Sequence, residues 1–312
     1  MLSRTAENLY WTGRYMERAE NMARVLDVSD RLSVQSRSSD DQSEWNAVLS
    51  ILEARKDFDK QYDRVSGSNV VDYLTLNRNT LASIWSCVRA ARENARALRA
   101  TISVEMWESL NTTWLTLRDM TLEQIQHRGL REFFDWVKER SHLFRGVAHG
   151  TMLHNEAYGF IRLGTFIERA DNTTRLLDTK YYLLGGMDGE TDPATQYYEW
   201  GAVLRSVGAF RAYHQTYHDV ITPERVAELL VLRPDMPRSL RFCFDRVTTM
   251  LAHYDSGRVL ESERLSGEFA ARLRYGQIGS IFKEGLHPFL MEAQDRIAAV
   301  SDQVARDFMM TV

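Results

Sequence analysis

The chain has 312 residues, of which 44% are hydrophobic and 11% aromatic, and its formal net charge is -4. This composition excludes a disordered chain, and the length allows one large domain or two closely packed ones. The small negative charge gives no general attraction to nucleic acid or to an anionic membrane. The two cysteines, Cys87 and Cys243, are too few for a disulfide framework or a cysteine-rich zinc site.

The N-terminal residues and the hydropathy pattern predict a cytoplasmic protein without a membrane span. The segment from Met1 to Asn8 lacks the apolar core of a secretory signal. No stretch of the chain approaches the roughly 20 apolar residues that a transmembrane helix needs. The low cysteine content fits a reducing compartment.

Helical periodicity dominates the chain, because apolar residues recur at spacings of three and four rather than in alternation. In the first half it predicts helices over residues 3–33, 41–55, 80–100, 103–126, 131–150 and 155–184. In the second half it predicts helices over residues 194–216, 223–232, 238–255, 258–275 and 281–310. The first proline is Pro193, so long helices are permitted before it. The sequence therefore predicts an all-α, multi-helix bundle of about ten helices.

An internal repeat is the most informative feature. The segment Gly13–Asp27 aligns without a gap to Gly164–Asp178, and eight of the fifteen positions are identical. Unrelated segments would share about one position at average residue frequencies. The repeat therefore predicts an internal duplication, with residues 1–150 and 151–312 as two helical halves packed as one unit.

Each copy of the repeat carries a polar stripe on its predicted helix. The two stripes consist of Glu17, Arg18, Asn21 and Arg24, and of Glu168, Arg169, Asn172 and Arg175. One interpretation is a solvated face with weak helical ion pairs. The other is a buried polar network or a ligand-binding site, which would require pairing of every charge. Because both copies retain the Glu, Arg, Asn and Arg residues while the apolar side changes, we favour the buried network or ligand site.

The repeat also predicts specific ion pairs. If the two Glu-Arg helices pack about an approximate two-fold axis, the polar stripes face each other. Glu17 would then meet Arg175 or Arg169, and Glu168 would meet Arg24 or Arg18, through charge-assisted bonds.

Other candidate sites carry weaker signals. His214 and His218, with Asp219 or His253, have helical spacing for a metal, but no His-Glu-x-x-His pattern accompanies them, so we predict no metal. His149 and His154 flank a predicted helix break and fit hydrogen bonding there. The segment from Trp107 to Trp114 fits a helix interface better than a ligand platform, and Cys87 and Cys243 fit core packing.

Nucleotide-binding and nucleophile motifs are missing from the sequence. It contains no Gly-x-x-x-x-Gly-Lys phosphate loop, no Gly-x-Gly-x-x-Gly and no Gly-x-Ser-x-Gly elbow. We therefore predict no bound cofactor, and nucleotide chemistry would need a partner protein.

The repeated Glu-Arg pair also supports a family resemblance. Together with Arg92-Glu93-Asn94-Ala95-Arg96 and Trp107-Glu108-Ser109-Leu110-Asn111 between the copies, it resembles the alpha-E family of uncharacterised bacterial helical proteins, end to end. Members of that family are typically encoded beside a circularly permuted ATP-grasp protein and a transglutaminase-like protein. The resemblance therefore implies a role in peptide ligation or peptide modification.

Two functions follow as hypotheses. The first is a non-catalytic helical partner of an ATP-grasp amide ligase, with a transglutaminase-like protein as a further partner. The second is an enzyme that uses Glu17 or Glu168 as general acid or base on an anionic or peptide substrate. A sensor or a nucleic-acid module is disfavoured by the charge and by the lack of a recognition motif.

Overall fold

The structure is a computed structural model that describes residues 1–35, 41–184, 192–254 and 259–309. Within these ranges 79% of the residues are helical, in sixteen helices, and none forms a strand. The all-α prediction is confirmed. The chain divides into two compact units, Met1–Thr165 (unit 1) and Phe166–Val312 (unit 2).

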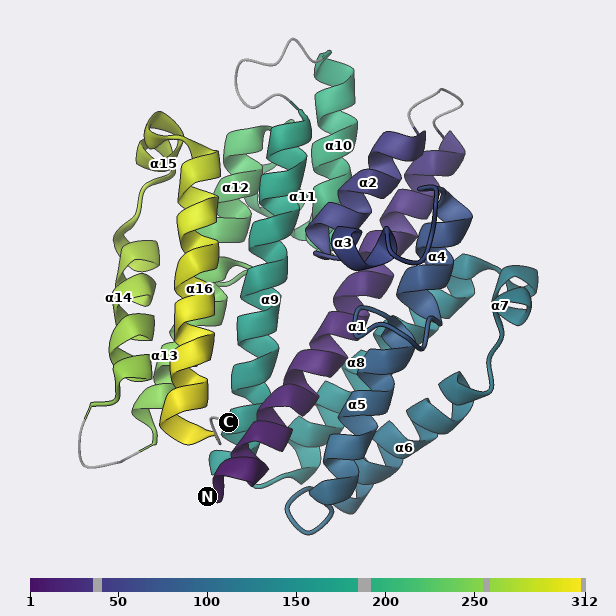
Figure 1. Ribbon diagram of the computed structural model, residues 1–312. Helices are drawn as coiled ribbons and strands as arrows, with labels where there is room; N and C mark the ends of the chain where they lie inside the picture. Colours follow the sequence, from purple (N-terminus) through teal and green to yellow (C-terminus); the bar gives the residue numbers. More distant parts are fainter. Residues whose placement is uncertain (36–40, 185–191, 255–258, 310–312) are drawn as a thin grey trace. The chain divides into compact units, whose positions relative to one another are not determined.

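The helices follow one another with short connections (Figure 1). The first eight are α1 Ser3–Gln35, α2 Asp41–Ile51, α3 Arg55–Phe58, α4 Gly67–Thr75, α5 Ile84–Ala97, α6 Val104–Arg118, α7 Leu122–Arg128 and α8 Leu130–Thr151. The other eight are α9 Glu156–Leu183, α10 Pro193–Ser206, α11 Phe210–Tyr217, α12 Pro223–Val231, α13 Leu240–Ala252, α14 Glu261–Tyr275, α15 Ile278–Glu284 and α16 Leu286–Phe308. Helix α9 begins in unit 1 and continues into unit 2.

Unit 1 is built on a bundle of α1, α5, α6 and α8. Helices α1 and α6 each pack against both α5 and α8, so that the four enclose a common core. The shorter α2 packs against α1, α3 and α4, and α7 packs against α8. Trp45 and Phe134 are among the largest fully buried side chains of this core.

Unit 2 repeats much of this order. Helix α14 packs against α13 and α16, as α6 packs against α5 and α8. The short helices α10, α11 and α12 contact one another, and α15 packs against α12 and α16. Trp200 and Phe244 are fully buried here.

The same local contacts recur in the two units. Ser83 and Ser239 cap α5 and α13 by accepting a hydrogen bond from the amide three residues further on. Each serine also donates to an upstream carbonyl, that of Asn77 at 2.6 Å and that of Arg233 at 2.5 Å. Residues of α5 to α8 therefore correspond to residues of α13 to α16 that lie 156 positions later.

Glycine serves the same purpose in both units. Gly129 separates α7 from α8 with a φ of +104°, and Gly285 separates α15 from α16 with a φ of +105°. L side chains rarely adopt such backbone angles, so glycine permits the abrupt change of helix direction.

The predicted count of about ten helices is too low. The segment predicted as one helix at 103–126 breaks where Thr121 caps α7, and the segment at 194–216 breaks at Gly208, whose φ is +68°. The segment predicted as one helix at 281–310 breaks at Gly285, which separates α15 from α16. Helices α3 and α4 were not predicted, and they span only four and nine residues. The packing of halves 1–150 and 151–312 as one unit stays a prediction.

Candidate functional site

The first polar stripe lies on a helix that is buried on nearly all sides. Between Met16 and Ser29, every residue of α1 is buried except Arg18 and Arg24, which are partly exposed. Glu17 and Asn21 therefore lie in the interior, together with Glu20, which has no exposed surface. The solvated-face interpretation is thus wrong for this part of the stripe.

Arg145 of α8 forms ion pairs with both buried glutamates. Its Nη1 lies 3.1 Å from Oε2 of Glu17 and also donates to Oε2 of Glu20. Both carboxylate side chains are 0% exposed, whereas the Arg145 side chain is 19% exposed. A buried carboxylate requires such a partner, because an unpaired charge in the interior is very costly.

The network continues from the interior toward the surface. Arg24 donates from Nε to Glu20 at 2.8 Å, and its Nη2 lies 3.3 Å from Nε2 of His142. Ser141 accepts from Arg145 at 2.9 Å and lies 3.3 Å from the carbonyl of Met16. Arg24 and His142, with side chains 17% and 53% exposed, form the outer part of this network.

A second group of charges lies two turns further along α1. Lys138 of α8 donates to Asp27 at 2.8 Å, and Arg31 binds Asp27 through both carboxylate oxygens. Lys138 also pairs with Asp135 at 2.7 Å, and this hydrogen bond lowers the pKa of Asp135. Burial and the nearby Asp27 charge raise the pKa of Asp30, although Arg31 opposes them.

The second stripe has different partners within unit 2. Arg169 is buried and donates to the carbonyl of Pro237 at 3.3 Å, just before the start of α13. Arg175 pairs with Asp171 at 2.9 Å and donates to Gln294 at 3.4 Å. Glu168 is buried, and Asn172 is partly exposed.

We next compare the partners of the two polar stripes on α8 and on α16. The position of α16 that corresponds to Arg145 is Ser301, and the position that corresponds to His142 is Ala298. The network around Arg145 is thus a feature of unit 1. The predicted ion pairs between the two Glu-Arg helices stay a prediction.

Within unit 1 the two Glu-Arg helices cross at glycines. A Cβ added at Gly13 of α1 would lie 2.1 Å from the carbonyl oxygen of Ile161, and one added at Gly164 of α9 would lie 2.1 Å from that of Tyr10. Gly13 and Gly164 are corresponding residues of the repeat, as are Tyr10 and Ile161, so the contact is reciprocal. The helix backbones touch here, and only glycine fits.

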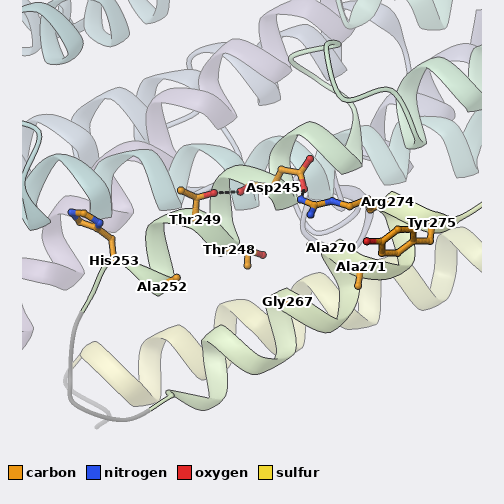
Figure 2. Close-up of a pocket in the computed structure, with 10 residues that line it drawn as sticks. All are labelled: Asp245, Thr248, Thr249, Ala252, His253, Gly267, Ala270, Ala271, Arg274 and Tyr275. Carbon is orange, nitrogen blue, oxygen red and sulfur yellow. Dashed lines mark hydrogen bonds and ion pairs between the residues drawn. The ribbon is translucent and has the colours of Figure 1, made fainter.

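A groove of about 560 Å³ opens between α13 and α14 in unit 2 (Figure 2). The groove is lined by small residues, among them Thr248, Ala252, Gly267 and Ala270. The corresponding positions of α5 and α6 carry larger residues, which are Arg92, Arg96, Asn111 and Trp114.

The weaker candidates have local partners. Asp219 binds Arg225, His214 packs against Phe210 and Tyr213, and His253 lines the groove of Figure 2. In the described part of the chain, no cluster of three or more His, Cys, Asp or Glu side chains could hold a metal ion.

At the break between α8 and α9, two histidines interact as predicted for helix-end hydrogen bonding. Nδ1 of His149 lies 3.0 Å from the hydroxyl of Tyr158, and Nε2 of His154 lies 3.0 Å from the carbonyl oxygen of His149. Cys87 and Cys243 are buried free thiols.

Comparison with known proteins assigns the family. Residues 1–309 match a family model described as Alpha-E, a predicted alpha-helical domain with a conserved ER motif. The chain belongs to the Alpha-E family. Glu17-Arg18 and Glu168-Arg169 are among the Glu-Arg pairs of this sequence. The resemblance inferred from the sequence is confirmed.

The curated relatives of this Alpha-E protein are longer. It is 26% identical to the uncharacterised protein Mb2597 of Mycobacterium bovis and to the uncharacterised protein Rv2567 of Mycobacterium tuberculosis. The alignments cover 97% of this chain but 36% of each relative, so the chain spans about a third of their length. No solved structure matches it significantly. Across the described helices, none combines the length and apolarity that crossing a membrane requires.

Proposed function

We propose that this Alpha-E protein is a non-catalytic helical partner of an ATP-grasp amide ligase in a peptide ligation or modification system. A transglutaminase-like protein is a second partner in this proposal. The observation that carries it is the commitment of the Glu17 and Glu20 carboxylates to Arg145 inside the bundle. In this proposal, carboxylates that are paired with an arginine inside the bundle specify the packing of the helices and do not act on a substrate.

The lengths of the relatives support a role beside other proteins. In both mycobacterial relatives the matched region is 36% of a longer chain. A helical module that forms part of larger chains fits a protein that works by association. The genomic neighbours implied by the family resemblance supply the expected class of partner.

The repeated contacts support an origin by internal duplication. We infer that an ancestral unit of eight helices was doubled, because the cap contacts of Ser83 and Ser239 and the glycines at 129 and 285 recur in register. We further propose a cytoplasmic location, which the free thiols of Cys87 and Cys243 favour.

The alternative is an enzyme that uses Glu17 or Glu168 as general acid or base. An arginine bonded to a carboxylate stabilises its ionised form, and Glu17 has such an arginine at 3.1 Å. This pairing argues against proton transfer by Glu17. For Glu168 the catalytic role stays a hypothesis, tested by the activity of a Glu168→Gln variant in the assembled system.

The partnership is tested with purified proteins. We expect the Alpha-E chain alone not to hydrolyse ATP, because its sequence has no phosphate loop. We expect it to co-elute in size-exclusion chromatography with an ATP-grasp protein from its own gene neighbourhood, the class of neighbour that the family resemblance implies. An ATP-grasp protein from a distant genomic locus is the matched control. ATP turnover by the chain alone, or no complex at micromolar concentrations, would contradict the proposal.

A further inference from the structure

A row of arginines runs along the outward face of α5. Arg89, Arg92, Arg96 and Arg99 recur at spacings of three and four, which places them on one side of the helix and of the turn that follows it. Arg89, Arg96 and Arg99 are exposed. Arg78, from the loop before α5, joins the row, and we call these five residues the arginine row.

Two tryptophans hold four of these guanidinium groups. Cζ of Arg78 and of Arg89 lie 5.1 and 5.5 Å from the ring centre of Trp85. Cζ of Arg92 and of Arg99 lie 5.3 and 5.0 Å from that of Trp107. An aromatic ring attracts a guanidinium but accepts none of its in-plane hydrogen bonds. Arg92 already donates to Asn111 at 3.2 Å and to Glu93 at 2.5 Å, whereas the stacking of Arg78, Arg89 and Arg99 leaves their in-plane donors for another acceptor.

The platform beneath the row is fixed by packing. Trp85 is 7% exposed and contacts the ring of Trp114 edge-on, at 4.9 Å between ring centres. Trp85 is therefore held in place, beneath Arg78 and Arg89, before any partner arrives. Such pre-organisation reduces the entropy that binding would cost.

The positive charge of the row is only partly neutralised. Glu93 pairs with Arg92 at 2.5 Å and with Arg96 at 3.0 Å. Arg78, Arg89 and Arg99 pair with no carboxylate among the residues that the structure describes. This excess of positive charge stands out on a chain whose formal net charge is -4.

The fold does not require the arginine row. At the positions of α13 that correspond to Arg89, Arg92 and Arg96, unit 2 has other residues, which are Asp245, Thr248 and Ala252. Helices α13 and α14 nevertheless pack together as α5 and α6 do. The pairing of these two helices therefore does not depend on arginines at these three positions.

We propose that the arginine row binds an acidic segment of a partner protein. Planar carboxylates match the paired N–H donors of guanidinium groups, and the tryptophans beside them supply apolar contact. Arginine and tryptophan are also the residues that most often dominate the energy of protein interfaces. The four arginines from 89 to 99 extend over about 15 Å, at 1.5 Å per helical residue.

A protein partner fits this surface better than nucleic acid does. Glu93 lies within the row and would repel the phosphates of a nucleic-acid backbone, whereas glutamate side chains of a peptide can turn toward the arginines and away from Glu93. The inference goes beyond the proposed partnership, because it names the surface and its chemistry whichever protein carries the acidic segment.

The test uses a fluorescein-labelled poly-glutamate peptide and fluorescence anisotropy at physiological salt. The variant Arg89→Gln/Arg99→Gln removes two arginines that have no carboxylate partner in the described structure. The matched control is Arg205→Gln/Arg246→Gln in unit 2, which removes two exposed arginines that also lie over rings, those of Phe210 and Phe242. Both variants have the same net charge, so a difference between them reports the position of the arginines.

We expect the Arg89→Gln/Arg99→Gln variant to bind poly-glutamate about tenfold more weakly than wild type, and the control to bind within about twofold of it. Equal binding by wild type and both variants, or equal losses in both variants, would overturn the proposal. Tighter binding of an oligothymidylate than of poly-glutamate would overturn it in favour of nucleic acid. Circular dichroism establishes that the variants are folded. If the row binds poly-glutamate but the ATP-grasp protein does not bind the chain, the inference stands and the proposed function fails.

Discussion

Arg145 is the residue on which the buried charges of unit 1 depend. It donates to both Glu17 and Glu20, and neither carboxylate has any exposed surface. Replacing it, as in Arg145→Ala, removes a guanidinium that bonds to both buried carboxylates. We expect this change to lower the free energy of unfolding by about 3 to 5 kcal/mol, measured by urea denaturation.

An exposed ion pair provides the control for Arg145. Arg264 pairs with Glu261 and Glu268 on the surface of α14. Exposed pairs contribute little to stability, so Arg264→Ala should have the urea midpoint of wild type. Equal stability of wild type and Arg145→Ala would show that the two glutamates do not need this arginine.

Only part of this network can be predicted from the sequence. The repeat singled out both polar stripes as candidate interior residues, because they are retained in both copies. In the first stripe Glu17 and Asn21 are buried, whereas Arg18 and Arg24 are partly exposed. The repeat could not identify Arg145 or Lys138, because the periodicity of one helix carries no information about which residue of another helix faces it. Glu20 was also missed, since its counterpart in the repeat is Asp171 and the position did not count as identical.

The crossing of α1 with the start of α9 predicts that alanine at either of its two glycines lowers the free energy of unfolding. A methyl group at Gly13 or Gly164 would collide with a backbone carbonyl at 2.1 Å. Because backbone cannot move aside as a side chain can, the two helices would have to separate. We expect Gly13→Ala and Gly164→Ala each to cost about 1 to 3 kcal/mol or more of unfolding free energy, measured by thermal or urea denaturation.

Two glycines of α8 are the matched controls. Gly146 and Gly150 are exposed, and a Cβ added at either would have no neighbour within 4 Å. Alanine favours the helix over glycine, so Gly146→Ala and Gly150→Ala should gain up to about 1 kcal/mol. A gain of stability in Gly13→Ala as well would mean that the helices are not in contact at that residue.

Long helices were easier to predict than short ones. Helices α1, α5, α8 and α9 have enough turns for their periodicity to stand out in the sequence. Helix α7 was joined to α6, because the apolar spacing continues through the break and only the cap contacts of Thr121 end the pattern. The sequence analysis also assumed that α1 has one apolar side, whereas the helix buries nearly its whole circumference.

The free energy of unfolding of the chain should depend on pH in the alkaline range. Tyr62 donates to Asp72 at 2.5 Å, and burial together with this bond raises the pKa of Tyr62 from 10.0 to about 12. In unit 2, Tyr217 donates to Glu228 at 3.0 Å, and burial and this bond raise its pKa as well. Between pH 10 and 12 the unfolded chain therefore loses these protons first.

The protonated hydroxyls of Tyr62 and Tyr217 therefore contribute fully to the free energy of unfolding below pH 10, and this contribution is lost as the pH rises through 12. We expect the urea midpoint of wild type to fall across this interval. The double variant Tyr62→Phe/Tyr217→Phe should lose less stability over the same interval. Tyr198→Phe, at a side chain that is 61% exposed, should behave as wild type. Identical slopes in wild type and the double variant would contradict the raised pKa values.

The difference between α5 and α13 bears on how many partners one molecule can hold. A chain with a similar helix order in two units would be expected to take up two copies of whatever it binds, one for each unit. Yet the described part of unit 2 has Asp245, Thr248 and Ala252 at the positions of three arginines in the row. Among the described residues the proposed acidic segment therefore meets one matching surface, and we expect one molecule of the Alpha-E chain to bind one partner.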